Sequence, residues 1–282
     1  MRTKTLLIAG AALALSLATS QAQNIYSANI VGYTTTVIPG GSVYSLIANT
    51  LNDDTNGVTE IFNNTFLKGS ESLFIWNGSG YYVYYYWGAG VGTGLGYLSD
   101  WTDGSYPPTH NIPNEVYDSS DDVYWTPIPT SKPGQAMFIL NPNGPETNIW
   151  QGSISLSNNV VIPGSSAYSM ISSPIPYIGD VAQAPVSLTA NFTSSELLFV
   201  WNGSGYYAYY YWGAGVGTGL GYPSDWADAS YPPTHNIPGE VYDSSDDIWW
   251  TLPVTNNIGQ GFFMLNPHGS AINWTQVFNN NN

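Results

Sequence analysis

Short runs of β-branched and aromatic residues alternate along the chain with turns rich in glycine, proline and asparagine. Runs of about five residues with such turns between them are typical of an all-β protein. The strands that we expect are 33–38, 43–48, 72–76, 81–87 and 136–140. A single short helix is expected over residues 58–62, after a capping Thr55 or Asn56. Because crossover helices are missing from the pattern, a β-sandwich or barrel is favoured over a parallel α/β fold.

The second feature of the pattern is a tandem duplication. Residues 71–126 recur without a gap as residues 196–251, and about 47 of the 56 positions are identical. No glycine-, serine- or proline-rich spacer separates the two copies, so they are expected to pack against each other. The fold class that we predict is all-β, with two tandem, closely packed β-sandwich-like or barrel-like repeats of about 120 residues. The expected boundaries are 23–152 and 153–278.

The N-terminus has the features of a secretory signal peptide. Arg2 and Lys4 precede an apolar run over residues 6–18, and small residues follow at Ser20 and Ala22. The apolar run is shorter than the ~20 residues that a membrane span needs. We therefore expect residues 1–22 to be removed, and the mature chain to be periplasmic or extracellular with no membrane span. Residues 279–282 form an asparagine tail.

Charge and cysteine content narrow the classes of partner. The chain has a net charge of −15, with 19 acidic residues and no cysteine. Removal of residues 1–22 leaves Lys68 and Lys132 as the only basic side chains, so the mature charge is 2 − 19 = −17. Nucleic acid is excluded because its phosphates need lysine and arginine. Disulfides and thiolate metal sites are excluded as well. Cations, neutral glycans and basic proteins remain.

Several motifs resemble a known group of proteins. The entry segment SANIVGYTTTVIPGG, the IWNGSGY hairpin and the late GQGFFMLNP strand are similar to those of secreted, uncharacterised β-rich proteins of environmental bacteria. The resemblance implies secretion and a β fold. It covers the entry region and the scaffold strands of each repeat, and it transfers no activity and no functional residue.

The hairpin strand at residues 81–87 is aromatic on both faces. Alternation along a strand places Tyr82, Tyr84 and Tyr86 on one face and their neighbours on the other. One interpretation is a platform on which sugar rings stack while the tyrosine hydroxyls donate hydrogen bonds. The other is an ordinary core with cross-strand tyrosine pairs. The candidate ligand-binding residues are Tyr82, Tyr84, Tyr86, Trp87, Tyr207, Tyr209, Tyr211 and Trp212.

Glycine then occupies every second position of residues 88–97. In a strand, this spacing would leave one face without side chains, as in silk-like stacked sheets. The alternative is a flexible glycine loop. The run lacks a following helix and a lysine, so it does not indicate a nucleotide site.

An acidic turn follows in each copy. Four carboxylates lie within eight residues of one another at positions 115–122, and oxygen ligands of this kind suit calcium. The alternative is a solvated acidic turn. The candidate metal ligands are Asp118, Asp121, Asp122, Asp243, Asp246 and Asp247, to which Asp100, Asp103, Asp225 and Asp228 would add if the loop folds back.

Catalytic motifs are scarce. The chain has no H-E-x-x-H for zinc and no G-x-S-x-G for a serine nucleophile. His110 and His235 lie in proline-rich turns and are expected to bond to the backbone. The sequence thus favours a secreted, non-catalytic protein that binds a polysaccharide or cell-surface glycan, with calcium as an optional ion and no required cofactor. A self-assembling structural protein is the alternative, and a glycoside hydrolase using the paired acids is the third hypothesis.

Overall fold

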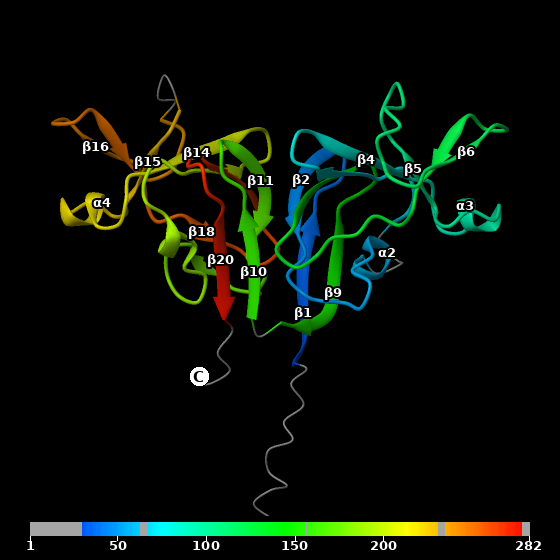
Figure 1. The fold of residues 1–282 in the computed structure, drawn as a ribbon, viewed down its shortest axis with the longest axis horizontal. Helices are drawn as coiled ribbons and strands as arrows, with labels where there is room; N and C mark the ends of the chain where they lie inside the picture. The colour runs from blue at the N-terminus through cyan, green and yellow to red at the C-terminus, as the bar shows by residue number, and fades with distance from the viewer. Residues whose placement is uncertain (1–29, 63–66, 156, 231–234, 278–282) are drawn as a thin grey trace, which may run out of the picture. The chain divides into compact units, whose positions relative to one another are not determined.

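The computed structural model describes residues 30–62, 67–155, 157–230 and 235–277 (Figure 1). The predicted signal peptide and the asparagine tail lie outside this part. The described residues form an all-β protein with two similar halves, each built on a seven-stranded antiparallel sheet. The predicted fold class is therefore confirmed. No helix among the described residues is long and apolar enough to cross a membrane.

The first half contains the seven-stranded sheet with the order β2-β8-β3-β4-β5-β7-β6. Its strands are β2 (Val43–Ala48), β3 (Ser72–Trp76), β4 (Tyr81–Tyr86), β5 (Trp101–Asp103), β6 (Val116–Asp118), β7 (Val123–Trp125) and β8 (Ala136–Asn141). A second sheet pairs β1 (Ile30–Ile38) with β9 (Glu146–Ile154). The short helices are α2 (Val58–Ile61) and α3 (Val91–Gly94).

The second half repeats this arrangement with the order β11-β19-β13-β14-β15-β17-β16. Its strands are β11 (Ala167–Ser172), β13 (Leu197–Trp201), β14 (Tyr206–Tyr211), β15 (Trp226–Asp228), β16 (Val241–Asp243), β17 (Ile248–Trp250) and β19 (Gly261–Asn266). The two-stranded sheets pair β10 (Ser157–Ile162) with β20 (Ile272–Val277), and β12 (Gly179–Asp180) with β18 (Thr255–Asn256). The helices are α4 (Val216–Gly219) and the 3₁₀ turn η2 (Leu188–Asn191).

The central hairpin forms where the sequence predicts it, because its turn is closed by local interactions. The side-chain oxygen of Asn77 accepts hydrogen bonds from the N–H groups of Ser79 and Gly80, both at 3.0 Å. Gly78 has φ of 103°, a conformation that side chains rarely adopt. The register then pairs Phe74 with Val83.

Two layers share one core in each half. In the first half, residues of the seven-stranded sheet pack against Ile38 of β1 and Trp150 of β9, both of which are fully buried. Trp101 and Trp150 are among the largest fully buried side chains, and Trp226 and Trp274 occupy the same places in the second half. β9 runs to Ile154, so the expected division after residue 152 falls inside a strand of the first half.

The two halves meet in contacts that occur twice with the halves exchanged. Nε1 of Trp76 donates to the carbonyl of Tyr168 at 2.9 Å, and Nε1 of Trp201 donates to the carbonyl of Tyr44 at 3.1 Å. A third buried cluster lies between them and contains Phe138 from the first half together with residues of the second. These reciprocal contacts have the pattern of a two-fold symmetric dimer interface, formed here between two halves of one chain.

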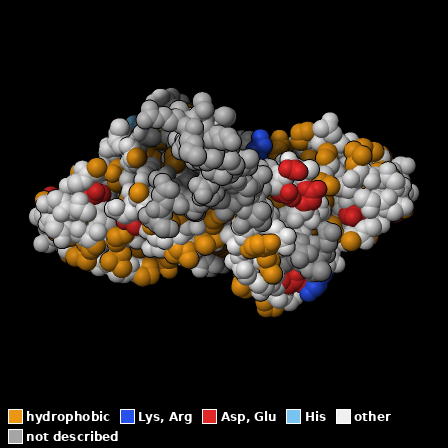
Figure 2. Space-filling model, turned by 90° about the horizontal axis from the view of Figure 1, so that it is seen from below, with side chains coloured by type: hydrophobic (Ala, Val, Ile, Leu, Met, Phe, Trp, Pro, Cys, Tyr) orange, Lys and Arg blue, Asp and Glu red, His pale blue; other side chains and the backbone are white. Residues whose placement is uncertain are grey.

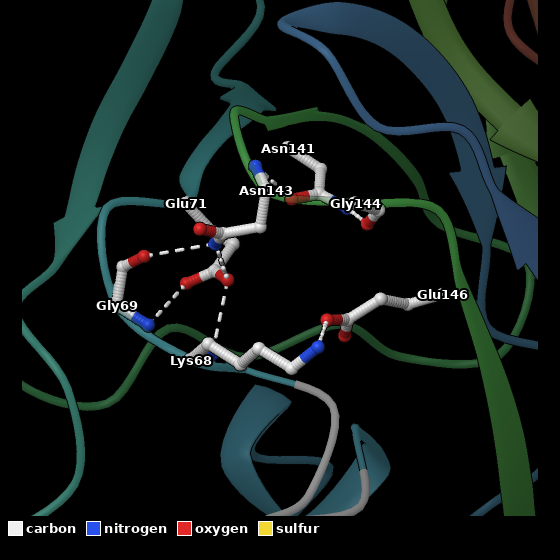
Figure 3. Close-up of polar contacts among 7 residues, drawn as sticks. All are labelled: Lys68, Gly69, Glu71, Asn141, Asn143, Gly144 and Glu146. Carbon is white, nitrogen blue, oxygen red and sulfur yellow. Dashed lines mark hydrogen bonds and ion pairs between the residues drawn. The ribbon is translucent and has the colours of Figure 1, made fainter.

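A buried carboxylate fixes the loop before β3 (Figure 3). The Glu71 side chain accepts hydrogen bonds from the N–H groups of Lys68 and Gly69 and from Nδ2 of Asn143, at 2.7 to 3.0 Å. Lys68 also forms an ion pair with Glu146. Both carboxylate oxygens of Glu71 accept hydrogen bonds from within the protein, so we assign Glu71 a structural role.

Candidate functional site

Tyr84 and Tyr86 of β4 face the core rather than solvent. Tyr84 and Tyr86 are 8% and 4% exposed and belong to the core cluster of the first half. Their counterparts Tyr209 and Tyr211 are buried in the second half. Of the two arrangements that the sequence leaves open, the core packing holds for these four residues. The expectation that they form an exposed platform is corrected, because Trp101 and Trp226 pack against this face.

The tryptophans that end these strands do reach the surface. Trp87 is 45% exposed and Trp212 is 39% exposed. The Trp87 ring lies edge-on to Tyr85, and its Nε1 donates to Oγ1 of Thr102 at 2.9 Å. A ligand at the surface can therefore contact the exposed edge of Trp87 but not Tyr86.

A pocket of about 410 Å³ opens on the first half. Trp76, Tyr82 and Tyr84 supply its aromatic wall, and Ile112, Pro113, Pro127, Ile128, Pro129, Thr130 and Gln135 are among its other lining residues. The volume falls within the ~300–1,000 Å³ range of small-molecule sites. Tyr82 and Tyr84 are thus the two predicted ligand residues of this repeat that line a hollow.

An apolar hollow also lies where the halves meet. It has a volume of about 300 Å³ and is lined by Trp76, Tyr168, Phe199, Tyr206 and Phe263. On the face shown in Figure 2, hydrophobic side chains are exposed in several places and acidic side chains lie in separate positions between them.

The glycine run forms a packed turn instead of a strand. Its centre is α3, and Gly90 has φ of 80°. The carboxylate of Asp100 accepts hydrogen bonds from the N–H groups of Gly90 and Thr93, each at 2.9 Å. The bare strand face that the alternation suggested is therefore absent from this segment, and Asp100 is occupied in holding the turn.

The acidic turn joins β6 to β7, and its carboxylates are used locally. Oδ1 of Asp118 accepts from the N–H and hydroxyl of Ser120 at 2.9 and 2.5 Å. These hydrogen bonds lower the pKa of Asp118 to about 2. Asp122 accepts the Tyr117 hydroxyl at 3.0 Å. Within the described residues, Asp118, Asp121 and Asp122 do not form a shared group, whereas Glu115 of the same turn lies near Asp103, which the sequence suggested as an additional ligand, and near His110.

Three side chains from separate segments converge in each repeat. The first set consists of Asp103 at the end of β5, His110 in the proline-rich turn and Glu115 before β6, and the second consists of Asp228, His235 and Glu240. Their ligand atoms all lie within 4.8 Å of one another. We call each set an acid–histidine group. The sequence offers a signal for it, since the three residue types recur at the same spacing of seven and five in both copies.

Local contacts hold the acid–histidine group in place. Oδ1 of Asp103 accepts from the N–H and hydroxyl of Ser105 at 2.8 and 2.6 Å. The His110 backbone has φ of 50°, and its ring lies on Tyr124 with centroids 4.0 Å apart. Nδ1 of His110 is 3.8 Å from Oε2 of Glu115. Among the described residues, the His110 ring thus lies near the Glu115 carboxylate and the Tyr124 ring rather than bonding to the backbone, and the backbone N–H of His110 donates to Oδ2 of Asp103 at 3.3 Å.

The glutamates of the two groups are buried next to another carboxylate. The side chains of Glu115 and Glu240 are 7% and 5% exposed. Burial, followed by the charge of Asp228 and a hydrogen bond with Asp228, raises the pKa of Glu240 to about 7, while the N–H of Ile237 opposes the rise. Burial and Asp103 raise the pKa of Glu115 in the same way.

The pocket and the acid–histidine group are neighbours. Tyr84 on β4 lies directly opposite Asp103 on β5 and also lines the pocket. Burial, followed by the charges of Tyr82, Glu115 and Asp103, raises the Tyr84 pKa to about 12. One end of the aromatic wall is thus next to two carboxylates, which are good acceptors for hydroxyl groups.

Comparisons of the chain with protein-family models, with curated proteins and with solved structures gave no match. Its function is therefore argued from the site alone.

Proposed function

We propose that this is a secreted, non-catalytic binding protein that holds a polysaccharide or cell-surface glycan in one pocket per repeat. The observation that carries the proposal is the pocket of about 410 Å³ walled by Trp76, Tyr82 and Tyr84. The flat rings of tryptophan and tyrosine pack on the apolar faces of sugars, while the tyrosine hydroxyls hydrogen-bond to them. The corresponding residues of the second repeat are Trp201, Tyr207 and Tyr209.

The charge of the chain supports a neutral glycan. An acidic protein whose only basic residues after position 22 are Lys68 and Lys132 repels anionic polymers. Lys68 is already paired with Glu146. Neutral sugars, which hydrogen-bond to carboxylates without charge repulsion, are the ligands that this surface tolerates.

Duplication supports a polymeric ligand. Two such sites on one chain, the second around Trp201, Tyr207 and Tyr209, would raise the apparent affinity for a polymer by ~10²–10⁴-fold in favourable geometries when both engage it. A small monovalent sugar would gain nothing from the second copy. The signal-peptide pattern of residues 1–22 favours a location where polysaccharides occur, outside the cytoplasm.

Affinity electrophoresis of the mature chain through a panel of neutral polysaccharides tests the proposal. We expect retardation on at least one glycan, and loss of most of it in the Tyr82→Ala/Tyr207→Ala variant. Tyr85→Ala/Tyr210→Ala is the matched control, since these tyrosines point to the opposite face of the same strands and bond to Ser70 and Ser195. Equal migration of the chain with and without every glycan would refute the proposal.

Glycoside hydrolysis is the second candidate, because each repeat pairs two carboxylates and the pKa of Glu240 is about 7. A glycosidase needs its carboxylates ~5–9 Å apart, on either side of the scissile bond. In the second repeat Asp228 is itself a hydrogen-bond partner of Glu240, so the two carboxyl groups meet each other instead of flanking a substrate, and binding is favoured over cleavage. Release of reducing ends from a bound glycan, abolished by Glu240→Gln together with Glu115→Gln, would reverse this preference.

The self-assembly alternative is less well supported than either. It depended on a glycine-lined strand face available for stacking, and the segment from Gly88 to Tyr97 is a turn around α3. Sedimentation of the mature chain over a concentration series would still detect assembly.

A further inference from the structure

We propose that each repeat also binds one divalent metal ion of the Zn²⁺ class in its acid–histidine group. The ligands are Asp103, His110 and Glu115 in the first repeat and Asp228, His235 and Glu240 in the second. This inference is independent of the glycan proposal, because none of these six side chains is needed for the aromatic wall of the pocket.

The first argument is that, within the described part of the chain, buried carboxylate oxygens of the group lack a positive or donating partner. In the second repeat, Oδ2 of Asp228 and Oε1 of Glu240 are buried, and no N–H or hydroxyl group of the described residues donates to either atom. The Glu240 side chain is 95% buried, from an exposed fraction of 5%. Two ionised carboxylates placed together in this way are costly unless a positive charge lies between them.

The protein supplies no fixed cation of its own. After residue 22 the sequence has two basic side chains, Lys68 and Lys132, and Lys68 pairs with Glu146. In the part of the chain that the structure describes, the ion-pair partner of Glu115 and of Glu240 is the histidine of its own group. The charge between the carboxylates must therefore come from a bound cation or a shared proton.

The spacing of the ligand atoms suits a metal better than a direct ion pair. Nδ1 of the histidine lies 3.8 Å from Oε2 of Glu115 and 3.9 Å from Oε2 of Glu240, which is too long for a hydrogen bond. Two ligands ~2.1 Å from one Zn²⁺ ion are ~3.4 Å apart at the tetrahedral angle. The histidine and glutamate ligand atoms would approach each other by about 0.4–0.5 Å on binding, and every pair of ligand atoms in a group already lies within 4.8 Å.

The surroundings have the organisation of a metal site. The Asp103 carboxylate is oriented by Ser105, and Oε1 of Glu115 accepts the Ile112 N–H at 3.2 Å. Such outer contacts fix the orientation of metal ligands. The His110 ring is held on Tyr124 while 48% of its side chain remains exposed. The exposed side leaves a fourth position for water, as in three-ligand zinc sites.

The donor set selects the ion. Calcium takes six to eight oxygen ligands, whereas each group offers two carboxylates and one imidazole nitrogen. Imidazole combined with carboxylates suits borderline ions such as Zn²⁺. This differs from the calcium site expected in the acidic turn, whose Asp118 is occupied by Ser120.

Calorimetric titration of the chelator-treated mature chain with Zn²⁺ alone tests the proposal. We expect two Zn²⁺ ions per chain for the wild type, one for His110→Gln, one for His235→Gln and none for the double variant. Each single variant retains the other repeat as an internal standard for correct folding. Circular dichroism of the variants should match the wild type, because both histidines are surface side chains.

His268→Asn is the matched control. It removes the third histidine, which lies against Glu196 and Thr193, and introduces the residue found at the equivalent position 143. This variant should still bind two ions. The proposal is overturned if the wild type takes up no Zn²⁺, if the double variant still binds two ions, or if Ca²⁺ binds at these sites while Zn²⁺ does not. The last two results would place the site elsewhere or change its class, and no uptake would mean that the carboxylates share a proton.

Discussion

Replacing Gly92 with alanine should destabilise the protein although the change adds a single methyl group. Gly92 is buried within α3. A Cβ at this position would lie 2.6 Å from Cε3 of Trp125, and the Ser99 carbonyl oxygen would be closer still. Real Cβ contacts are essentially never shorter than 3.0 Å, so either the α3 turn or the Trp125 ring must shift.

The neighbours of Gly92 have little freedom to move. Trp125 is 3% exposed and stacks on Tyr97 with ring centroids 5.1 Å apart and planes at 15°. The other contact is the backbone carbonyl of Ser99, a residue whose side-chain hydroxyl donates to the Thr126 carbonyl at 2.5 Å. Overpacking of a rigid core costs ~1–3 kcal/mol, and this site should be at the upper end, about 3 kcal/mol. For a domain of this size, that corresponds to a fall of ~6–12 °C in Tm.

Thermal unfolding followed by circular dichroism measures the effect, and Gly94→Ala is the control. Gly94 lies in the same short helix, but no described heavy atom lies within 4 Å of an added Cβ. It should be neutral or stabilising by up to ~1 kcal/mol, since alanine restricts the unfolded chain. Gly217→Ala should repeat the Gly92 result in the second half. Equal Tm values for Gly92→Ala and Gly94→Ala would refute the packed-turn description.

Two further predictions concern pH and the contact between the halves. Hydrogen bonds from Ser120 lower the pKa of Asp118 from 3.8 to about 2. The contribution of the ionised Asp118 to stability is therefore complete above pH ~4 and is lost as the pH falls toward 2. Asp118→Asn should lower Tm at pH 7 but much less at pH 2, and equal losses at both pH values would count against a stabilising role of the ionised carboxylate. Trp76→Phe and Trp201→Phe each remove one indole hydrogen bond between the halves. Each substitution should lower the free energy of unfolding, measured in urea, by about 1 kcal/mol. No loss in either variant would show that these hydrogen bonds do not stabilise the contact between the halves.

The elements that the sequence predicts well are those closed by local interactions. The hairpin around Asn77 needs only a side-chain amide and glycines that accept positive φ, and both are visible in the sequence. Strands β2 and β3 match the expected ranges because each is a short run of bulky residues that lies between turn residues. Helix α2 begins at the expected residue 58, but its N-cap is Gly57 and no side chain caps it, so the predicted cap at Thr55 or Asn56 is wrong.

The glycine run was predicted less well because its conformation depends on distant residues. Alternating glycines fit a strand or a loop equally well by themselves. The turn around α3 is decided by Asp100, which accepts two of its N–H groups, and by Trp125, which fills the space above Gly92. Neither contact can be read from the spacing of the glycines.

The buried face of the tyrosine strand and the acid–histidine group could not be predicted either, because both depend on residues that are distant in the sequence. A strand with rings on both sides does not reveal which side meets the core, and here Trp101 and Trp150 determine it from other segments. Asp103, His110 and Glu115 belong to a strand end, a turn and the approach to another strand, so only the folded chain brings them together. Their shared spacing in both copies was visible, but it did not indicate proximity.

The most direct test of the glycan proposal is the number of sites. A soluble oligosaccharide of the glycan that retards the protein should be titrated calorimetrically into the wild type, Tyr82→Ala and Tyr207→Ala. We predict two sites per chain for the wild type and one for each variant, because each pocket loses its own aromatic wall. Unchanged stoichiometry and affinity in both variants would contradict the account.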